Sequence, residues 1–506
     1  MPNRRDFLRM GLGVGAATAL GSAGAFGAGS SPVRGADWDR LRRALRGQLV
    51  LPSDPTYDLA RQLELEQFDA VHPQAVAYCV SEQDVRTVLA FAQDNALPAV
   101  PRSGGHSFGG YSTSPGIVLD VSRCNHSVHI GGSTVDVGPG TQLVDALAAL
   151  SPRGLAIASG TCPNVCLGGF VQGGGIGYLT RAHGLGTDRM VSASVVLADG
   201  TTVQASAEEH PDLYWALRGN GGGNFGVITS YRLRTVEIDS MVNYTLVFPW
   251  AQAAEVIDAW QQWMLTGPRE LSGTINILDA APGTDTPQVQ VNGSFLGSKD
   301  TADQLASQLV SMAGVPPLSR TVTQQSYSAA MMDWYGCGDL SVAECHRIGY
   351  SPQAQLARMN YYHTRNRMYA DAMPPRDVEQ MLAAFTTEPR AGQFRLIFFE
   401  ALGGAVNDVS RTETAYVHRT ANFVAGFGVA LDSPDYDQDD AAAAEHWLIG
   451  TFATLRDSLG ESYQNFMDPA LSDWRQSYYA ENYARLVHTR HRYDPHHFFD
   501  FARAID

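Results

Sequence analysis

The sequence is poor in positive charge and has no basic tract. Lysine and arginine number 36 against 52 aspartates and glutamates, which gives a formal net charge of −16. Proteins that bind nucleic acid concentrate positive charge on one surface, so this composition argues against such a partner. A phosphate-bearing ligand would have to be held by local N–H groups and single arginines rather than by a positive field.

Long apolar runs are also rare. The one candidate, residues 10–28, is rich in glycine and follows Arg4 and Arg5. Paired arginines before such a run are typical of a twin-arginine export signal, and the glycines would weaken the alternative, a membrane anchor. We expect residues 1–30 to direct the folded chain through the twin-arginine machinery to the periplasm, cell envelope or medium, with cleavage near Ala25 or Ala28. No other run is long enough to span a bilayer.

Cysteine is sparse as well. The six residues lie at positions 79, 124, 162, 166, 337 and 345. Export would permit disulfides, and Cys337 and Cys345 enclose a short loop and could pair. The sequence alone leaves the connectivity open.

The first half of the chain mixes short strands and helices. Apolar spacing predicts helices at residues 37–50, 82–92, 142–150 and 210–217. Strands are predicted at residues 75–80, 97–100, 116–121, 133–137, 192–197 and 201–205. Ser81 begins the second helix with a Ser-x-x-Asp cap, and Asp199-Gly200 is a hairpin signal between the last two strands.

The second half has longer strand-like runs, and we place a domain boundary at residues 235–240. Helices are predicted at residues 253–265 and 300–313, and strands at residues 289–296, 394–402 and 422–431. The acidic run at residues 435–440 is expected to be a solvated loop. This alternation is typical of an antiparallel sheet with helices on one face, which makes the fold class α+β.

Two glycine-rich stretches stand out from this background. Residues 101–110 read PRSGGHSFGG and follow a predicted strand, and residues 160–177 read GTCPNVCLGGFVQGGGIG. Glycines allow a ligand to approach the backbone closely, and successive N–H groups in such turns can bind phosphate oxygens. A Gly-Gly pair alone usually marks only a turn, so the weight lies in the two stretches together.

Together the stretches resemble the FAD-linked oxidases of the berberine-bridge-enzyme type, in the vanillyl-alcohol oxidase superfamily. That family carries R-x-G-G-H, then G-x-C-P-x-V-G-x-G-G followed by G-G-G-x-G. Further matches lie at residues 183–185, 198–200, 217–229, 478–486 and 493–495, so the resemblance covers residues 60–506. It implies an exported bacterial flavoprotein of two domains. A discontinuous FAD-binding domain would comprise residues 31–238 and 463–506, and an antiparallel-sheet substrate domain covered by helices would comprise residues 239–462.

The resemblance also implies covalent FAD. In bicovalent members a histidine and a cysteine bond to the flavin, and these positions are His106 and Cys162 here. Cys166, which replaces a glycine usual in the family, is the alternative thiol. Val165 occupies a position where valine accompanies oxidases and leucine dehydrogenases, which favours O2 as the electron acceptor. The other FAD contacts implied are Arg102, Ser103, Gly104, Gly105, Ser107, Thr161, Gly168, Gly169, Gly174, Gly175, Gly226, Ile228 and Asn482.

The catalytic base is where the sequence departs from the family pattern. Relatives that oxidise sugars or alcohols often have a tyrosine in a Y-x-N-Y-x-D run, and Phe466 stands there in this chain. Ile176 and Phe427 likewise replace polar residues, which favours an apolar or aromatic substrate or a base from elsewhere. The candidate bases are Tyr463, Glu400, His363 and Tyr361. Tyr463 is preferred because it lies three residues from the lost phenol.

We therefore expect an oxidase that passes electrons from a small organic molecule to O2 and releases H2O2. The substrate would be a sugar, a glycosylated natural product or an aromatic metabolite. An FAD-dependent dehydrogenase or oxidative cyclase is one alternative. A flavin-bound binding module that has lost catalysis is another, because residues 176, 427 and 466 are apolar. No metal site and no nucleic-acid partner are expected.

Overall fold

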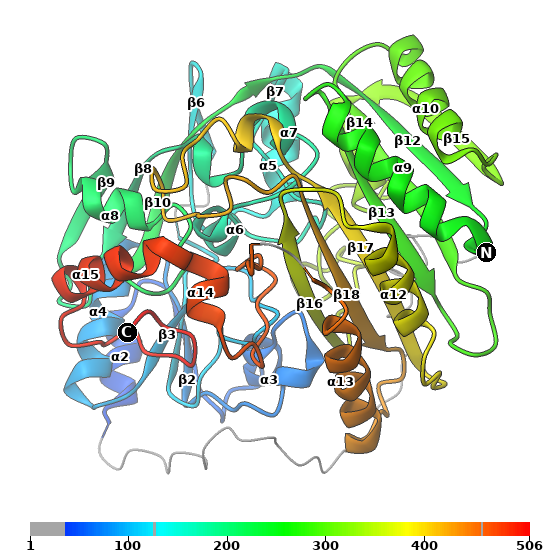
Figure 1. The fold of residues 1–506 in the computed structure, drawn as a ribbon. Coiled ribbons are helices and arrows are strands. Elements are labelled where there is room, and N and C mark those ends of the chain that lie inside the picture. The colour runs from blue at the N-terminus through cyan, green and yellow to red at the C-terminus, as the bar shows by residue number, and fades with distance from the viewer. Residues whose placement is uncertain (1–35, 125–127, 457–458) are drawn as a thin grey trace.

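The computed structural model describes residues 36–124, 128–456 and 459–506, so the predicted export signal lies outside the described residues. Figure 1 shows a large sheet, carrying helices on its outer face, packed beside a body of smaller sheets and helices. None of the helices in these described ranges is long and apolar enough to cross a membrane. The arrangement is α+β, as the sequence predicts.

The first part of the chain forms two small sheets. Strands β2 (Ala75–Tyr78), β4 (Ile117–Asp120) and β3 (Ala99–Arg102) run parallel. Strand β2 leads into the crossover helix α4 (Glu82–Asp94), whose cap Ser81 accepts a hydrogen bond from the Asp84 N–H. The predicted hairpin joins β8 to β9. Within the described residues, the sheet orders are β1 (Gln48–Val50), β2 (Ala75–Tyr78), β4 (Ile117–Asp120), β3 (Ala99–Arg102), and β5 (His129–Gly131), β6 (Thr134–Val137), β10 (Val227–Arg234), β8 (Met190–Val196), β9 (Thr202–Ser206).

The helix predicted at residues 37–50 is only partly correct. Helix α2 spans Trp38–Ala44, and residues 48–50 form β1 instead. Leu49 pairs with Ala77 of β2, and a Cβ added at Gly47 would lie 1.9 Å from the Tyr78 carbonyl oxygen. Because the chain approaches β2 this closely, sheet pairing overrides the helical spacing of the leucines.

Short helices connect the strands of this first part and pack against them. The central ones, α5 and α6, share a buried core with β8, β10 and α11. The connecting helices are α3 (Tyr57–Arg61), α5 (Leu143–Leu150), α6 (Leu167–Gly173), α7 (Thr180–His183) and α8 (Pro211–Ala216), whereas α11 (Tyr327–Trp334) comes from the second part of the chain. The predicted domain boundary, residues 235–240, contains β11 (Val236–Glu237), which pairs with β7 (Leu155–Ala156), and ends where the long strand β12 (Ser240–Phe248) begins.

The second part is a single antiparallel sheet. Within the described residues its order is β15 (Ser319–Ser326), β12 (Ser240–Phe248), β14 (Gln288–Phe295), β13 (Leu271–Asp279), β17 (Gln393–Ala401), β18 (Phe423–Leu431), β16 (Tyr361–Tyr369). Helices α9 (Ala253–Thr266), α10 (Lys299–Ala313), α12 (Pro375–Phe385) and α13 (Gln438–Phe452) cover its outer face (Figure 1). This agrees with the predicted antiparallel sheet covered by helices.

Alternation along the central strands separates two faces of this sheet. Ile397 and Phe399 of β17 belong to the buried core under the helices, as does Phe427 of β18. Since successive strand residues point to opposite faces, Phe398 and Glu400 point toward the smaller sheets. Phe427 therefore packs beneath helix α13, where its ring lies 5.9 Å from that of Trp447.

The end of the chain returns to the first part. Helices α14 (Trp474–Tyr479) and α15 (Tyr483–Tyr493), red in Figure 1, contact each other, and α15 lies beside α8. Tyr478, Tyr479 and Leu486 are buried in the same core as β8 and β10. The Arg485 guanidinium lies 3.9 Å from the centre of the Trp215 ring of α8. The final residues thus complete the body that holds the glycine-rich stretches.

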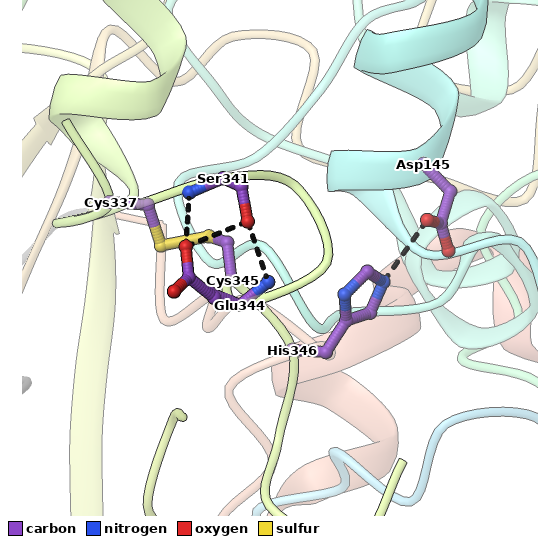
Figure 2. The surroundings of a disulfide bond; sticks show 6 residues. All are labelled: Asp145, Cys337, Ser341, Glu344, Cys345 and His346. Atoms are coloured by element: carbon purple, nitrogen blue, oxygen red, sulfur yellow. Dashed lines mark hydrogen bonds and ion pairs between the residues drawn. A yellow bond between two sulfur atoms is a disulfide. The ribbon is translucent and has the colours of Figure 1, made fainter. Parts of the chain in front are cut away.

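Two local predictions have different outcomes. The acidic run is not simply a loop: Asp437 caps α13 in a reciprocal capping box with Asp440, because carboxylates stabilise a helix N-terminus. The disulfide between Cys337 and Cys345 is confirmed. The disulfide lies at the start of the loop of residues 335–360. His346, next to Cys345, has its Nε2 3.0 Å from Asp145 Oδ1 of α5, the ion pair drawn in Figure 2.

Candidate functional site

Two cavities meet where the glycine-rich stretches face the large sheet. The first, which we call the glycine cavity, is lined by residues 100–108, 160–162, 165–166, 168–170, 221–223, 226–228 and 463–467, among others. The second, the sheet cavity, is lined by Glu64, residues 356–362 and side chains of β13, β14, β17 and β18. Residues common to both linings are His106, Phe108, Thr161, Cys162, Glu400 and Phe466. These residues form the junction of the two cavities.

The two cysteines of the second glycine-rich stretch have different surroundings. Cys162 is half-buried and lies at the junction with His106. Cys166 is buried, its thiol donates to the Gly140 carbonyl oxygen over 3.2 Å, and burial raises the pKa of that thiol. A Cβ added at Gly104 would lie 2.7 Å from Cys166 Sγ. Cys166 therefore fills the space beneath the Gly104 backbone, whereas Cys162 faces open volume.

Backbone rather than side chains forms much of the glycine cavity wall. Gly221, Gly222 and Gly223 all have positive φ angles, of 83°, 93° and 75°. Only glycine adopts this conformation readily, so the loop exposes bare backbone to the cavity. The Asn220 side chain holds the loop by accepting a hydrogen bond of 2.8 Å from the Gly222 N–H.

Two of the three guanidinium nitrogens of Arg102 are bound to neighbouring residues of the chain. Its Nε lies 2.6 Å from Asp120 Oδ2, and its Nη2 donates to the Ala60 carbonyl oxygen over 2.7 Å. The remaining nitrogen, Nη1, is buried and has no hydrogen-bond partner among the described residues. Because Arg102 lines the glycine cavity, this nitrogen is suited to an acceptor on a ligand.

Tyr463 supports the loop of three glycines. Its hydroxyl oxygen accepts hydrogen bonds from the Gly175 N–H at 2.8 Å, the Ile176 N–H at 3.3 Å and Asn465 Nδ2 at 3.1 Å. Burial raises the pKa of Tyr463 to about 12, although these hydrogen bonds act to lower it. The phenol is therefore protonated at neutral pH and cannot take up a proton there. The turn expected here exists, since the Phe466 N–H donates to the Tyr463 carbonyl oxygen.

Glu400 occupies a different position from the other candidate bases. It is half-buried on the inner face of β17, opposite Thr274 of β13, and lines both cavities. Aromatic rings surround the junction: Phe466 lies 5.8 Å from Phe398 and 5.8 Å from Phe108. Glu400 is thus a carboxylate at the meeting point of the cavities, next to a largely aromatic wall.

His363 and Tyr361 lie further away, on β16. His363 Nδ1 is 2.8 Å from Glu445 Oε2 of α13, and His363 is in neither cavity lining. Tyr361 lines the sheet cavity but not the junction, and its ring stacks on His363 at 4.8 Å. Burial, followed by the Glu445 carboxylate, raises the pKa of Tyr361.

All the predicted FAD contacts line the glycine cavity except Gly174, Gly175 and Asn482. Gly175 donates to Tyr463, and a Cβ at Gly174 would lie 3.0 Å from the rings of Tyr416 and Tyr463. Asn482 Nδ2 donates to the carbonyl oxygens of Arg411 and Thr414 at 2.7 and 3.1 Å. Gly174 and Gly175 thus lie against Tyr463, a lining residue, whereas Asn482 holds the segment of residues 411–415.

Sequence reasoning missed the aromatic wall and Gln464. Phe398 could have been found, because it is two residues from Glu400 in a predicted strand and shares its face. Phe108 and Gln464 carried no such signal, since both lie in irregular backbone that only the fold brings to the cavities.

Comparison with known proteins bears on what this site holds. Models of an FAD binding domain, of a berberine and berberine-like domain and of a twin-arginine pathway signal match residues 73–206, 462–506 and 1–21. The uncharacterized FAD-linked oxidoreductase YgaK of Bacillus subtilis is 27% identical, over 91% of this chain and 97% of its own length. The chain thus carries an FAD-binding domain and a berberine-like domain, and it is similar over most of its length to FAD-linked oxidoreductases.

The relatives of this FAD-linked oxidoreductase also include an oligosaccharide oxidase. The glucooligosaccharide oxidase of Sarocladium strictum is 29% identical, over 86% of this chain and 87% of its own. Among solved structures, Physcomitrella patens BBE-like 1 has a TM-score of 0.83 and 22% identity, with coverage of 92% of this chain and 98% of that one. The fold predicted from the motifs is therefore confirmed.

The cofactor of the oxidoreductase is FAD, and the glycine cavity fits it. The bare backbone at Gly221–Gly223 suits a phosphate-bearing ligand, as does the buried Arg102 Nη1, which has no partner in the part of the chain that the structure describes. The cavity ends at the junction that His106 and Cys162 line.

The twin-arginine signal indicates where the enzyme works: it is exported, and acts in the periplasm or the medium.

Proposed function

We propose that this oxidoreductase is an oxidase that passes electrons from a small organic substrate to O2. The observation that carries the proposal is the junction, where His106 and Cys162 of the glycine cavity face Glu400 of the large sheet. Val165 lines the glycine cavity, as expected of an oxidase in the family. Xylooligosaccharide and glucooligosaccharide oxidases are among the relatives, each covered over 87% of its length.

His106 and Cys162 would hold FAD covalently. A structure of the glucooligosaccharide oxidase from Acremonium strictum, 23% identical, carries a 6-S-cysteinyl, 8α-N1-histidyl FAD. The half-buried Cys162 at the junction suits the second bond better than the buried Cys166. FAD in such a site accepts a hydride from a substrate carbon and returns the electrons to an acceptor.

Glu400 is our candidate for the base that takes the substrate proton. It is the candidate that lines both cavities and carries a carboxylate, and a general base must lie within reach of the reacting group. Tyr463 also lines the glycine cavity, but its hydroxyl oxygen accepts hydrogen bonds from the Gly175 and Ile176 N–H groups. This choice moves the predicted base from the C-terminal segment to the large sheet.

The sheet cavity suits a substrate with both a flat apolar part and polar groups. Phe394, Phe398 and Tyr362 line its aromatic side, whereas Asn276 and Gln290 line it from neighbouring strands β13 and β14. Aromatic faces pack against rings, and amide side chains hydrogen-bond hydroxyl groups. An aromatic or glycosylated natural product has both features.

Reoxidation of the reduced enzyme tests the proposal. The purified enzyme is reduced anaerobically with one equivalent of dithionite, mixed with air-saturated buffer, and followed by flavin absorbance and a peroxidase-coupled assay for H2O2. An oxidase regains its colour within seconds and yields one H2O2 per flavin. Reoxidation over many minutes would instead assign the enzyme to the dehydrogenases.

A further inference from the structure

A completely buried histidine lies behind the glycine cavity. His418, in the segment between β17 and β18, has 0% of its surface exposed. Its Nδ1 is 2.8 Å from Glu461 Oε2, and its Nε2 is 3.0 Å from Gln464 Oε1. Both partners are acceptor oxygens, so each ring nitrogen must carry a hydrogen to form these bonds. A histidine with two N–H groups is the charged imidazolium.

The orientation of the Gln464 amide supports this reading independently. Its Nε2 donates to the Gly219 carbonyl oxygen over 2.9 Å, which fixes Oε1 on the side of His418. Turning the amide around would set its oxygen against the Gly219 oxygen. A neutral His418 that donates to Glu461 would present a lone pair to Gln464, and one of the two Gln464 bonds would be lost. The complete set of bonds therefore requires the imidazolium.

Neighbouring charges compensate the buried imidazolium. Burial acts to raise the pKa of Glu461, but the hydrogen bonds and charges of His418 and Arg411 outweigh it and hold that pKa below its ordinary value. Arg411 Nη2 lies 2.6 Å from Glu461, and its Nε 2.7 Å from Glu481 at the surface. Arg419, next in the chain, is paired with Asp188. Buried charges persist when they are paired in this way.

The hydrogen-bonded chain ends on two walls of the FAD cavity. Gln464 lines the glycine cavity and belongs to the segment of residues 463–467. Gly219 begins the loop that carries Gly221–Gly223, and its own N–H donates to the carbonyl oxygen of Gln172, another lining residue. Gln464 and Gly219 lie 245 residues apart in the sequence. One buried imidazolium thus connects two distant segments at the cofactor.

We propose that His418 is a positioning residue: held as an imidazolium between Glu461 and Gln464, it fixes the Gln464 amide and, through it, two walls of the FAD cavity. His418 itself lines neither cavity. The proposal concerns the cavity wall and does not depend on which substrate or electron acceptor the enzyme uses.

Nitrogen NMR of the holoenzyme tests the charge directly. The chain has 14 histidines, so the enzyme is labelled with ¹⁵N-histidine and the His418 signals are assigned by their loss in His418→Gln. The spectrum is recorded at pH 8, where exposed histidines, with a pKa of about 6.5, are neutral. We expect both ring nitrogens of His418 to be protonated. A His418 with one unprotonated nitrogen overturns the proposal, whatever the enzyme oxidises.

Two matched variants test the positioning role. Glu461→Gln removes the carboxylate, so the imidazolium signals should disappear and the visible circular dichroism of the bound flavin should change. Glu481→Gln removes the exposed partner of Arg411, which does not touch His418. This variant should retain both the imidazolium signals and the flavin dichroism. His363→Gln removes a His–Glu pair of the same 2.8 Å length outside the cavities and should leave the flavin dichroism unchanged.

The result that overturns the positioning role is a flavin dichroism unchanged in Glu461→Gln although the imidazolium is lost. If Glu461→Gln does not fold, Gln464→Met provides the same test, because it keeps a side chain of similar length without the amide. A flavin dichroism unchanged in Gln464→Met would equally reject the role of Gln464 as the link.

Discussion

The two thiols near His106 differ in what surrounds them. Cys162 lies at the junction of the cavities, whereas Cys166 is packed under Gly104 and donates to Gly140. A thiol that must form a bond to a bound ring needs access to it, and a buried structural thiol is chemically inert. Access therefore distinguishes the two residues where their spacing in the sequence does not.

Substitution of these cysteines should separate their roles. In Cys162→Ala the flavin should remain bound to the denatured chain through His106, with a changed absorption spectrum. Cys166→Ala should keep both attachments and lower the melting temperature, because it leaves a cavity under Gly104. Flavin fluorescence on a denaturing gel checks this, and the double variant His106→Ala, Cys162→Ala should release all its FAD on acid precipitation. If the Cys166→Ala variant instead loses its cysteine–flavin bond, the bond belongs to Cys166 rather than to Cys162.

Glu400 and Tyr463 should respond differently to removal of their functional groups. Glu400→Gln should slow flavin reduction by roughly 10²–10⁴-fold, the usual size of a general-base effect, with little loss of stability. Tyr463→Phe leaves the buried Gly175 N–H and the partly buried Ile176 N–H without this acceptor, so it should cost about 1–3 kcal/mol of unfolding free energy. Stopped-flow reduction and denaturant unfolding of both variants check this. A Tyr463→Phe enzyme of normal stability that reduces its flavin a hundredfold more slowly would reverse the assignment.

Val165 offers a test of the electron acceptor. Val165→Leu adds one methylene at the glycine cavity wall, which should slow reoxidation by O2 and leave flavin reduction nearly unchanged. The two half-reactions are measured separately by stopped flow. Equal slowing of both would show that the larger side chain distorts the site, since overpacking costs about 1–3 kcal/mol.

Single residues also mark how far the sequence could lead. The motif positions His106, Cys162 and Val165 all line the predicted cavity, because their spacing fixes a local backbone shape. Phe427 was misread as a cavity position, since only its pairing with Ile397 shows that it points to the helices. Gln464 and its bond to Gly219 depend on a contact across 245 residues, which no local pattern encodes.

At the scale of elements, long strands were easier to predict than short ones. The runs at residues 394–402 and 422–431 became β17 and β18 within one residue at each end, because both are long and strongly apolar. The three-residue β1 was lost inside a helical leucine spacing, since its pairing with β2 is not visible locally. Helix α13 was missed because its acidic cap resembles a solvated loop.

The loop of residues 335–360 is the element whose order most affects the sheet cavity. Its later part supplies Arg358 and Met359 to the cavity lining, and Arg358 is tied to Asp69 by an ion pair of 2.6 Å. Its beginning is closed by the disulfide, whose cysteines are eight residues apart. The cavity wall is therefore anchored at both ends of the loop.

Removal of the disulfide should weaken this wall. A cross-link that closes so short a loop stabilises by about 2–3 kcal/mol in the chain-entropy model. The double variant Cys337→Ala, Cys345→Ala should lower the melting temperature and raise KM for the substrate, while covalent flavin is retained. Calorimetry and the flavin-to-protein absorbance ratio check this. An unchanged melting temperature would show that the Arg358 ion pair and packing alone hold the loop.

At the scale of the whole molecule, the FAD cavity is assembled from both ends of the chain. The linings combine residues 100–108 with residues 463–467, and the last helix, α15, packs on α8. The antiparallel sheet contributes Glu400 and Thr274 from between these segments. No single contiguous segment forms this cavity, so the complete binding site exists only when nearly the entire chain is folded.

Export in the folded state follows from the signal and can be tested. Replacing both signal arginines, Arg4→Lys with Arg5→Lys, should retain the enzyme in the cytoplasm with its FAD already bound. Fractionation of expressing cells, followed by flavin fluorescence of the protein band in each fraction, checks this. An enzyme still found outside the cytoplasm would show that another route accepts the chain.

Export of a folded chain also means that the disulfide between Cys337 and Cys345 forms late, after the chain has left the cytoplasm. The cytoplasm keeps thiols reduced, so Cys337 and Cys345 cross the membrane as thiols within a finished fold. Their Cα atoms lie 5.9 Å apart in the bonded form, inside the range of about 4.4–6.8 Å usual for a disulfide. The disulfide therefore forms after export, when the chain is already folded, and it does not guide folding. It stabilises the enzyme only outside the cytoplasm, where cytoplasmic chaperones cannot refold the chain.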